Sequence, residues 1–280
     1  MKALVTGVKG QLGFDVVNEL KNRGHDAVGV DIEEMDITDP ESVSRVIGEA
    51  APDVVIHCAA WTAVDAAEDP ENIAKVRAVN AGGTRNIAQV CKKLDCKMMY
   101  ISTDYVFNGQ GTQPWQPDCR DYAPLNVYGQ TKLEGELAVA DTLEKYFIVR
   151  IAWVFGKNGS NFIKTMLNVG KKHDTVRVVS DQIGTPTYTL DLARLLVDMR
   201  NRRNTAITMP PTKGAISAGM TLPARSTNRL AMPQEWCRSP LRNTVFPKRH
   251  GPSTAVWTNP NWQKTGFNPF LHGRTHCNDI

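Results

Sequence analysis

Five short, mostly apolar runs recur along the chain up to residue 171, and an amphipathic stretch follows each of them. The runs are Ala3–Thr6, Ala27–Val30, Val54–His57, Met98–Ser102 and Phe147–Ile151. Runs of this kind are typical of strands that are buried on both faces. The intervening helical patterns cover Gln11–Arg23, Pro40–Ala50, Pro70–Leu94, Val127–Ala138 and Asn161–Lys171. This alternation predicts an α/β fold with a doubly wound parallel sheet of the Rossmann type.

The composition is that of an ordinary globular protein. Its 280 residues are 41% hydrophobic and 22% charged, which is enough to bury a core. The chain opens directly on a predicted strand, with no leader pattern and no apolar run long enough to span a bilayer, so we expect a cytoplasmic protein without a membrane partner. The six cysteines show no paired spacing, so we expect neither a metal site nor a disulfide framework.

The charge balance changes near residue 200. Residues 200–280 hold 12 of the 33 Lys and Arg but 2 of the 29 Asp and Glu, which gives them a net charge of +10. The net charge of residues 1–199 is −6. They also hold 9 of the 16 prolines and show no helical or alternating apolar period. We therefore divide the chain into a dinucleotide-binding domain (1–150), the start of a substrate-binding part (151–199) and an aberrant tail (200–280). The tail lacks a helical stripe of Lys and Arg, so we expect no nucleic-acid partner.

The turn after the first predicted strand, TGVKGQLG, spaces Gly7, Gly10 and Gly13 as GxxGxxG. Glycines here let the backbone approach a pyrophosphate, which then lies at the helix N-terminus. Asp31 ends the second predicted strand, where a carboxylate can accept hydrogen bonds from the adenosine ribose hydroxyls. No Arg follows it to bind a 2′-phosphate, which favours NADH and leaves NADPH open. Asp31 could also be a simple turn residue.

Three more segments follow predicted strands: MDIT (35–38), CAAWTAVD (58–65) and ISTDYVFNG (101–109). In an open parallel sheet, ligands bind outside the carboxyl ends of the strands. Tyr128 and Lys132, in NVYGQTK, stand four residues apart and so share one helix face. A neighbouring ammonium lowers a phenol pKa and suits it to general acid catalysis. Packing alone explains many such pairs, but the glycine turn and the hydroxyls of Ser102 and Thr103 favour chemistry.

These motifs together resemble the extended short-chain dehydrogenase/reductases. TGVKGQLG, AAWTAVDAAE, VNAGGTRNIA, STDYVFNG, PLNVYGQTKLEGE, RIAWVFG and DQIGTPTYTLDLA are similar, in order and spacing, to the dTDP-4-dehydrorhamnose reductase family over residues 1 to about 199. A sugar-nucleotide dehydratase of this superfamily would carry an acidic residue after STD, where this chain has Tyr105. The resemblance therefore implies reduction rather than dehydration.

The family resemblance implies an NAD(P)H-dependent enzyme that reduces the C4 keto group of dTDP-4-dehydro-L-rhamnose to give dTDP-L-rhamnose. Tyr128 would be the general acid. Lys132 would lower its pKa and hold the nicotinamide ribose. Thr103 would hydrogen-bond the reacting oxygen, with Asp104 beside the substrate and Trp153 flanking the sugar. The residues expected to line the dinucleotide are Gly7, Gly10, Gln11, Leu12, Gly13, Asp31, Asp36, Ile37, Ala60, Trp61, Thr62, Tyr128 and Lys132.

Two alternatives stay open: a non-catalytic, dinucleotide-binding regulatory subunit of the same fold, or a reductase of another sugar nucleotide. Retention of Thr103, Tyr128 and Lys132 favours an enzyme. A homodimer and a bound Mg²⁺ are possibilities that only the family resemblance suggests.

The tail departs from the family, which continues with segments like YGYYHATNEGGYISWYDF and ARPFNSRLD. Neither is present. Yet residues 214–222 (GAISAGMTL) can be encoded by codons that encode GYISWYD when read in a shifted frame. In that same frame, codons for residues 249–258 (RHGPSTAVWT) encode ARPFNSRLD. We therefore predict that residues from about 200 onward are the family's C-terminal segment translated out of frame. Weak or absent turnover and poor solubility would follow, because apolar surface would lose its cover.

Overall fold

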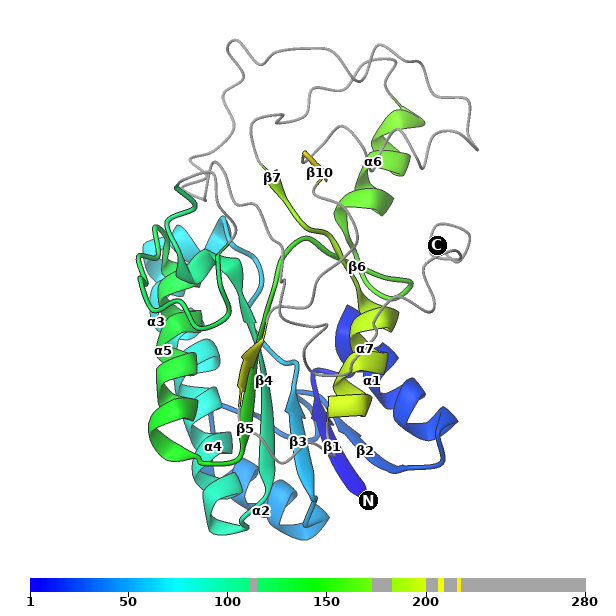
Figure 1. Cartoon of the computed structure of the whole chain (residues 1–280), viewed down its shortest axis with the longest axis vertical. Helices are drawn as coiled ribbons and strands as arrows, with labels where there is room; N and C mark the ends of the chain where they lie inside the picture. Colours follow the sequence, from blue (N-terminus) through cyan, green and yellow to red (C-terminus); the bar gives the residue numbers. More distant parts are fainter. Residues whose placement is uncertain (111–114, 173–182, 200–205, 209–215, 218–280) are drawn as a thin grey trace.

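A parallel sheet of six strands forms the centre of the molecule (Figure 1). The computed structural model describes residues 1–110, 115–172, 183–199, 206–208 and 216–217. The strand order is β2-β1-β3-β4-β5-β9, with β1 and β3 side by side, so the chain winds outward in both directions from this pair. The strands are β1 (Lys2–Thr6), β2 (Asp26–Val30), β3 (Val54–His57), β4 (Lys97–Thr103), β5 (Tyr146–Ile151) and β9 (Ala206–Thr208). The predicted fold class is confirmed.

Helices cover both faces of the sheet. On one face, α1 (Gln11–Asn22) packs against α7 (Thr189–Met199), and their Val16, Leu20, Leu192 and Leu196 are buried with apolar residues of the sheet. The other face carries α2 (Pro40–Ala50), α3 (Pro70–Arg77), α4 (Thr84–Lys93) and α5 (Val127–Thr142). The sheet is therefore buried on both sides, which explains why its strands read as apolar runs without alternation.

The remaining elements lie above the carboxyl ends of the strands in Figure 1. Strand β6 (Val154–Phe155) pairs with β8 (Thr187–Tyr188), β7 (Ile183–Gly184) pairs with β10 (Ile216–Ser217), and α6 (Phe162–Gly170) follows β6. Short helical turns occur at η1 (Ala66–Glu68) and η3 (Asp104–Val106). None of the helices that the structure describes is long and apolar enough to cross a membrane.

The helix predicted over Pro70–Leu94 is present as one run of helical residues, but it is not a regular α-helix throughout. A π-helical turn, η2 (Ala78–Gly83), separates α3 from α4. Gly83 lies against Ile37, so close that a Cβ at Gly83 would stand 2.7 Å from the Ile37 Cγ1. Tertiary packing thus overrides the helical period here, and π turns of this kind are frequent at functional sites.

Of the elements that were not predicted, α7 and β9 belong to the main layers of the fold. The helix α7 has the helical apolar spacing of Leu192, Leu195 and Leu196, a signal that was available in the sequence. Strand β9 lies in the tail, where we predicted no regular element, and it pairs in parallel with β5. Three residues are too few to show a period, so only the exposed edge of β5 could select this segment.

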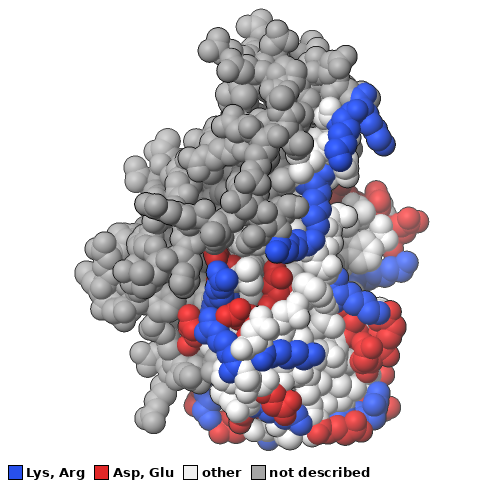
Figure 2. All heavy atoms as spheres, turned by 90° about the vertical axis from the view of Figure 1, so that its right-hand side faces the viewer, with Lys and Arg blue, Asp and Glu red and all other residues white. Residues whose placement is uncertain are grey.

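Charged side chains of both signs are mixed on the described part of the face shown in Figure 2. Arg23, at the end of α1, pairs with both Glu19 and Asp198, and Lys9 pairs with Glu33. These exposed pairs contribute little to stability.

Among the described residues, one ion pair is buried. Arg150 of β5 donates from Nη2 to Glu136 Oε2 at 2.6 Å and from Nε to Oε1 at 2.8 Å, and both side chains are almost fully buried. The guanidinium also donates to the Tyr122 hydroxyl at 3.1 Å and lies 5.0 Å from the Phe107 ring. The pair therefore ties β5 to α5 and to the long segment that follows β4.

Replacing one member of this pair should leave the other as a buried charge without its partner. We expect Glu136→Gln to lower the free energy of unfolding by about 3–5 kcal/mol, measured by urea denaturation. Lys145→Met, which removes the exposed Lys145–Asp95 pair, is the control and should change it little. A loss from Glu136→Gln as small as that of the control would contradict this account.

Candidate active site

The glycine turn is shaped by contacts that no side chain could fit. Gly7 has a φ of +69°, and a Cβ there would stand 2.8 Å from the Ala59 Cα. A Cβ at Gly13 would overlap the Gly7 carbonyl oxygen, so α1 can lie directly on the turn. Gly10 is the N-cap of α1 and supplies no side-chain cap. The first amides of α1 are therefore free for an anionic ligand, as the sequence predicted.

Asp31 lies beside this turn. Its Oδ2 accepts from the Lys9 backbone amide at 2.9 Å, and its Oδ1 accepts from the Ile32 amide at 3.0 Å. Its carbonyl also accepts from the Glu34 amide, so Asp31 has the turn role that we considered as well. The two roles are compatible, because a carboxylate has lone pairs to spare for ribose hydroxyls.

The MDIT segment is held in place by short hydrogen bonds. Asp36 Oδ1 accepts from the Thr38 amide at 2.9 Å and from the Thr38 hydroxyl at 2.7 Å. The buried Ile37 accepts at its carbonyl from Asn86 Nδ2 at 2.9 Å. This places Asp36 and Ile37 next to the π turn η2, whose Gly83 packs on Ile37.

Asn80 organises the segment after β3, and sequence reasoning missed it. Its Oδ1 accepts from the Trp61 amide at 2.8 Å, while its Nδ2 donates to the Trp61 carbonyl at 3.3 Å and to Thr131 Oγ1 at 3.1 Å. Ala60 and Trp61 are half-buried and Thr62 is exposed. Asn80 therefore links the predicted cofactor segment to the helix that carries Tyr128.

A buried polar chain beneath the turn was also missed. Thr6 Oγ1 accepts from the Cys58 and Ala59 amides, both at 3.1 Å, so its own proton goes to His57 Nδ1 at 2.8 Å. His57 then carries its proton on Nε2 and donates it to Thr84 Oγ1 at 3.2 Å. Burial, and secondarily the charge of Lys132, lowers the pKa of His57 to about 3, so the imidazole is neutral.

Tyr128 enters the site from the first turn of α5. Asn126 caps the helix by accepting from the Gly129 amide at 2.7 Å, and Gly129 packs so tightly on the Tyr105 carbonyl that a side chain there would collide with it. The Thr103 hydroxyl lies near the Tyr128 phenol and acts to lower its pKa, against the larger effect of burial. Thr103 also donates to Asp104 Oδ1 at 3.0 Å. The structure thus brings Thr103, Asp104 and Tyr128 together at the carboxyl end of β4.

Lys132 lies one turn further along α5 and is 2% exposed. Its Nζ donates to the Ile101 carbonyl at 2.7 Å and stands 4.1 Å from the centre of the Tyr100 ring. Burial lowers the pKa of Lys132 to about 7, against an opposing effect of Glu136. The ammonium is therefore close to its titration point at neutral pH.

The expected effect of Lys132 on Tyr128 is corrected by this geometry. Burial, and then the charge of Asp104, raises the pKa of Tyr128 well above its usual value. The ammonium is directed at the Ile101 carbonyl, so it does not lower the phenol pKa in this arrangement. Burial likewise raises the pKa of Asp104 to about 6.

Trp153 lies after β5 with a φ of +48°, which is uncommon for a residue with a side chain. Its carbonyl accepts from the Thr187 amide at 3.2 Å, and its ring packs on Gly184 so closely that a Cβ at Gly184 would stand 2.6 Å from the indole. Trp153 therefore joins β6 to the β7–β8 segment. Its place beside a sugar stays a prediction.

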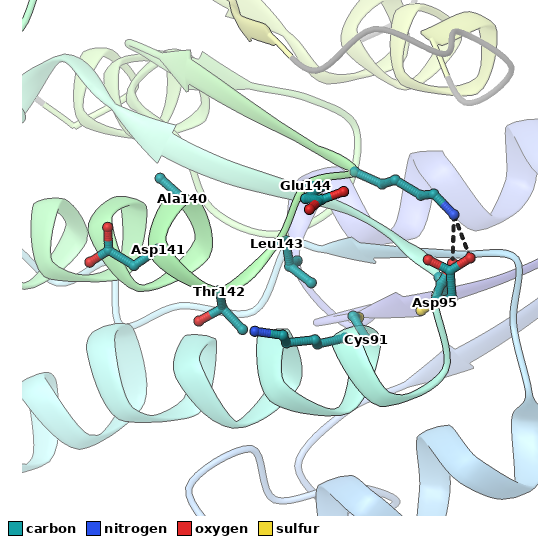
Figure 3. Close-up of a pocket in the computed structure, with 10 residues that line it drawn as sticks. Cys91, Asp95, Ala140, Asp141, Thr142, Leu143 and Glu144 are labelled. Carbon is teal, nitrogen blue, oxygen red and sulfur yellow. Dashed lines mark hydrogen bonds and ion pairs between the residues drawn. The ribbon is translucent and has the colours of Figure 1, made fainter.

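A pocket of about 310 Å³ lies at the opposite end of the sheet (Figure 3). It lies where β4 and β5 begin, and its lining includes Cys91, Asp95, Cys96, Leu143 and Lys145. Lys145 and Asp95 pair across it at 2.5 Å. Since Thr103 and Tyr128 belong to the other end of the strands, this pocket is separate from the candidate active site.

Comparison with known proteins decides the family. A family model described as the RmlD substrate binding domain matches residues 1–212. A dTDP-4-dehydrorhamnose reductase from Streptomyces griseus is 44% identical over 191 residues, which cover 68% of this chain and 62% of that protein. This chain belongs to the dTDP-4-dehydrorhamnose reductase family.

Other members of the family extend the comparison. A dTDP-4-dehydrorhamnose reductase from Mycobacterium tuberculosis is 33% identical over 281 residues, covering 98% of this chain and 90% of that protein. Two solved reductases of the same name, from Clostridium acetobutylicum and, in complex with NADP, from Bacillus anthracis, are 36% and 33% identical. Each superposes with a TM-score of 0.86, over 95% of this chain and 93% of its own. The predicted family is confirmed.

The low pKa of Lys132 predicts a specific pH dependence of stability. Its folded pKa is about 7 and its ordinary value is 10.5, so between these the unfolded chain holds a proton that the folded chain has lost. Stability therefore rises with pH in this window, by at most about 1.4 kcal/mol per pH unit. We expect the parent chain to gain stability relative to Lys132→Met from pH 7 to 10, measured by urea denaturation. A difference that is flat with pH would refute the assignment.

Proposed function

We propose that this chain is built as an NAD(P)H-dependent reductase that converts the C4 keto group of dTDP-4-dehydro-L-rhamnose into the hydroxyl of dTDP-L-rhamnose. The observation that carries the proposal is the cluster of Thr103, Asp104 and Tyr128 at the carboxyl end of β4, with Lys132 one turn away, in a member of this reductase family. The glycine turn fits a dinucleotide, because a Cβ at Gly7 or Gly13 would fill the space in which the backbone turns.

Tyr128 acts as the proton donor in this proposal. Burial and Asp104 keep the phenol protonated at neutral pH, and the Thr103 hydroxyl lies close to it. A reduced nicotinamide, when bound, supplies the hydride to C4 of the sugar. As negative charge develops on the carbonyl oxygen, Tyr128 gives it a proton, and the Thr103 hydroxyl turns from Asp104, to which it donates in the free chain, to donate a second hydrogen bond to that oxygen. Lys132 is assigned to the nicotinamide ribose rather than to the phenolate, because its ammonium donates to the Ile101 carbonyl.

The end of β2 bears on the choice of dinucleotide. Asp31, Glu33 and Glu34 place carboxylates near the predicted adenosine ribose, and Lys9 is paired with Glu33 at 2.5 Å. Carboxylates accept from ribose hydroxyls and repel a 2′-phosphate. We therefore propose that NADH binds at least as well as NADPH.

The substrate is less closely constrained than the reaction. A relative named dTDP-4-keto-6-deoxy-D-glucose reductase, from Streptomyces niveus, is 42% identical over 195 residues. Another dTDP-linked 4-keto sugar is therefore the second candidate substrate. The homodimer, the Mg²⁺ and the cytoplasmic location remain predictions.

We also propose that the chain is out of frame beyond residue 200, which leaves 1–150 as the dinucleotide-binding domain and 151–199 as a truncated substrate part. Two of the relatives align over 198 and 191 residues, which cover 71% and 68% of this chain, whereas the Mycobacterium tuberculosis relative covers 98% of it and so aligns into the tail. Residues 204–222 can all be encoded by codons that, when read in the shifted frame, encode YGYYHATNEGGYISWYDF. The shift would thus lie before residue 204, and the source DNA tests it directly.

Turnover tests the proposed function. NADH oxidation with enzymatically generated dTDP-4-dehydro-L-rhamnose should be slow or absent for this chain and restored when the reading frame is corrected. In the corrected chain, Tyr128→Phe should lower turnover about 100-fold or more, because a general acid is lost, while NADH affinity stays within about twofold.

The other outcomes separate the alternatives. Full activity of the present chain would show that the tail is dispensable and would overturn the frameshift account. Dinucleotide binding without turnover in the corrected chain would favour the regulatory subunit. Turnover that survives Tyr128→Phe would remove Tyr128 from the mechanism.

A further inference from the structure

We infer that Asn158 is a positioning residue for the dinucleotide: its side-chain amide fixes the backbone orientation of the glycine turn from the substrate side of the molecule. This inference rests on the proposed function. Asn158 lies in the loop between β6 and α6, and its Nδ2 donates to the Lys9 carbonyl at 2.9 Å and to the Gly10 carbonyl at 3.0 Å. Both partners are acceptors, so only the NH₂ group of the amide can face them.

The bond to the Gly10 carbonyl matters most for a ligand. The peptide between Gly10 and Gln11 is planar and trans, so its carbonyl and the Gln11 N–H point in opposite directions. When Asn158 holds the carbonyl, it also fixes the direction of the Gln11 N–H, the first amide of α1. This amide is one of those that an anionic group at the helix N-terminus would meet.

Asp31 holds the Lys9 amide of the turn, whereas Asn158 holds the carbonyls of Lys9 and Gly10. Gly10 is the N-cap of α1 and has no side chain to offer, and the Gly10 amide donates to the Gly7 carbonyl at 3.1 Å. A glycine-rich turn loses more backbone freedom on ordering than other sequences do. An external clamp such as Asn158 reduces the entropy that a bound dinucleotide would otherwise have to remove.

Asn158 can act as a clamp because its own loop is held at both ends. On one side, Gly156 packs on Thr189, whose hydroxyl donates to the buried Asp15 of α1 at 2.5 Å. On the other side, Asn161 caps α6 and donates from Nδ2 to the Gly156 carbonyl at 2.9 Å and to Gln11 Oε1 at 3.1 Å. Lys164 donates to the Gly159 carbonyl at 2.9 Å. The loop thus presents Asn158 from a fixed support.

Dinucleotide titration of this chain, followed by the fluorescence of NADH, provides the test. Asn158→Ala should weaken NADH binding roughly fivefold to tenfold, because two hydrogen bonds are lost. Asn158→Asp should weaken it further, since a carboxylate would face two carbonyl oxygens. The matched control is Asn72→Ala, which removes a 2.9 Å bond from an asparagine Nδ2 to the Ala66 carbonyl, away from the turn, and should leave the affinity unchanged.

Competition experiments separate positioning from general damage. If Asn158 acts through the phosphate-facing amides, Asn158→Ala should raise the inhibition constant of ADP, measured by competition with NADH. The inhibition constant of adenosine, which has no phosphate, should stay unchanged. Equal losses for both competitors, or NADH affinity within about twofold of the parent, would overturn the inference.

Hydrogen exchange of the turn gives a readout that needs no ligand. The amides of residues 7–13 should exchange faster in Asn158→Ala than in the parent chain and in Asn72→Ala. If the parent chain binds neither NADH nor NADPH, the proposed function fails. The exchange of these amides then decides the inference alone, and unchanged exchange would overturn it.

Discussion

The Thr6 hydroxyl holds together the place where β1 and β3 meet the candidate active site. It accepts from the amides of Cys58 and Ala59, which follow β3, and it donates to His57 within that strand. These bonds bring Ala59 to the position where only a glycine fits at residue 7. The tight turn before α1 therefore depends on a buried polar contact between β1 and β3. An unpaired hydroxyl or imidazole in the same place would cost the full price of desolvation.

The same chain of hydrogen bonds continues from β3 to α5, the helix that carries Tyr128. From His57 it passes through Thr84 to Asn80 in the π turn, and from Asn80 to Thr131 of α5. The π turn turns Asn80 inward, so that one amide side chain bridges the segment after β3 and the helix of Tyr128. A regular helix over the same residues would alter this alignment.

One face of α5 carries successive functional and structural groups at four-residue intervals. Tyr128 stands beside Thr103, Lys132 reaches the carbonyl of Ile101, and Glu136 pairs with Arg150. The buried Glu136–Arg150 pair fixes the helix against β5, and the negative charge of Glu136 partly offsets the effect of burial on Lys132. Helix position and proton affinity are therefore set by the same contacts.

The sequence by itself determined the first five strands of the sheet, the glycine turn and the shared helix face of Tyr128 and Lys132, because these follow from local periods and from residues that lie close together along the chain. Apolar runs indicate the strands, and a four-residue spacing places two side chains on one helix face. It also indicated the change near residue 200 from charge and proline content alone.

Only the tertiary structure decided the contacts between distant segments. Thr6 meets His57 across 51 residues, and Asn158 meets Gly10 across 148. No local pattern marks these partners, since each is defined by where its strand or loop lies in the fold. The direction of the Lys132 ammonium was also decided there, because the Ile101 carbonyl accepts its hydrogen bond, and so was the raised pKa of Tyr128, which follows from burial and from Asp104.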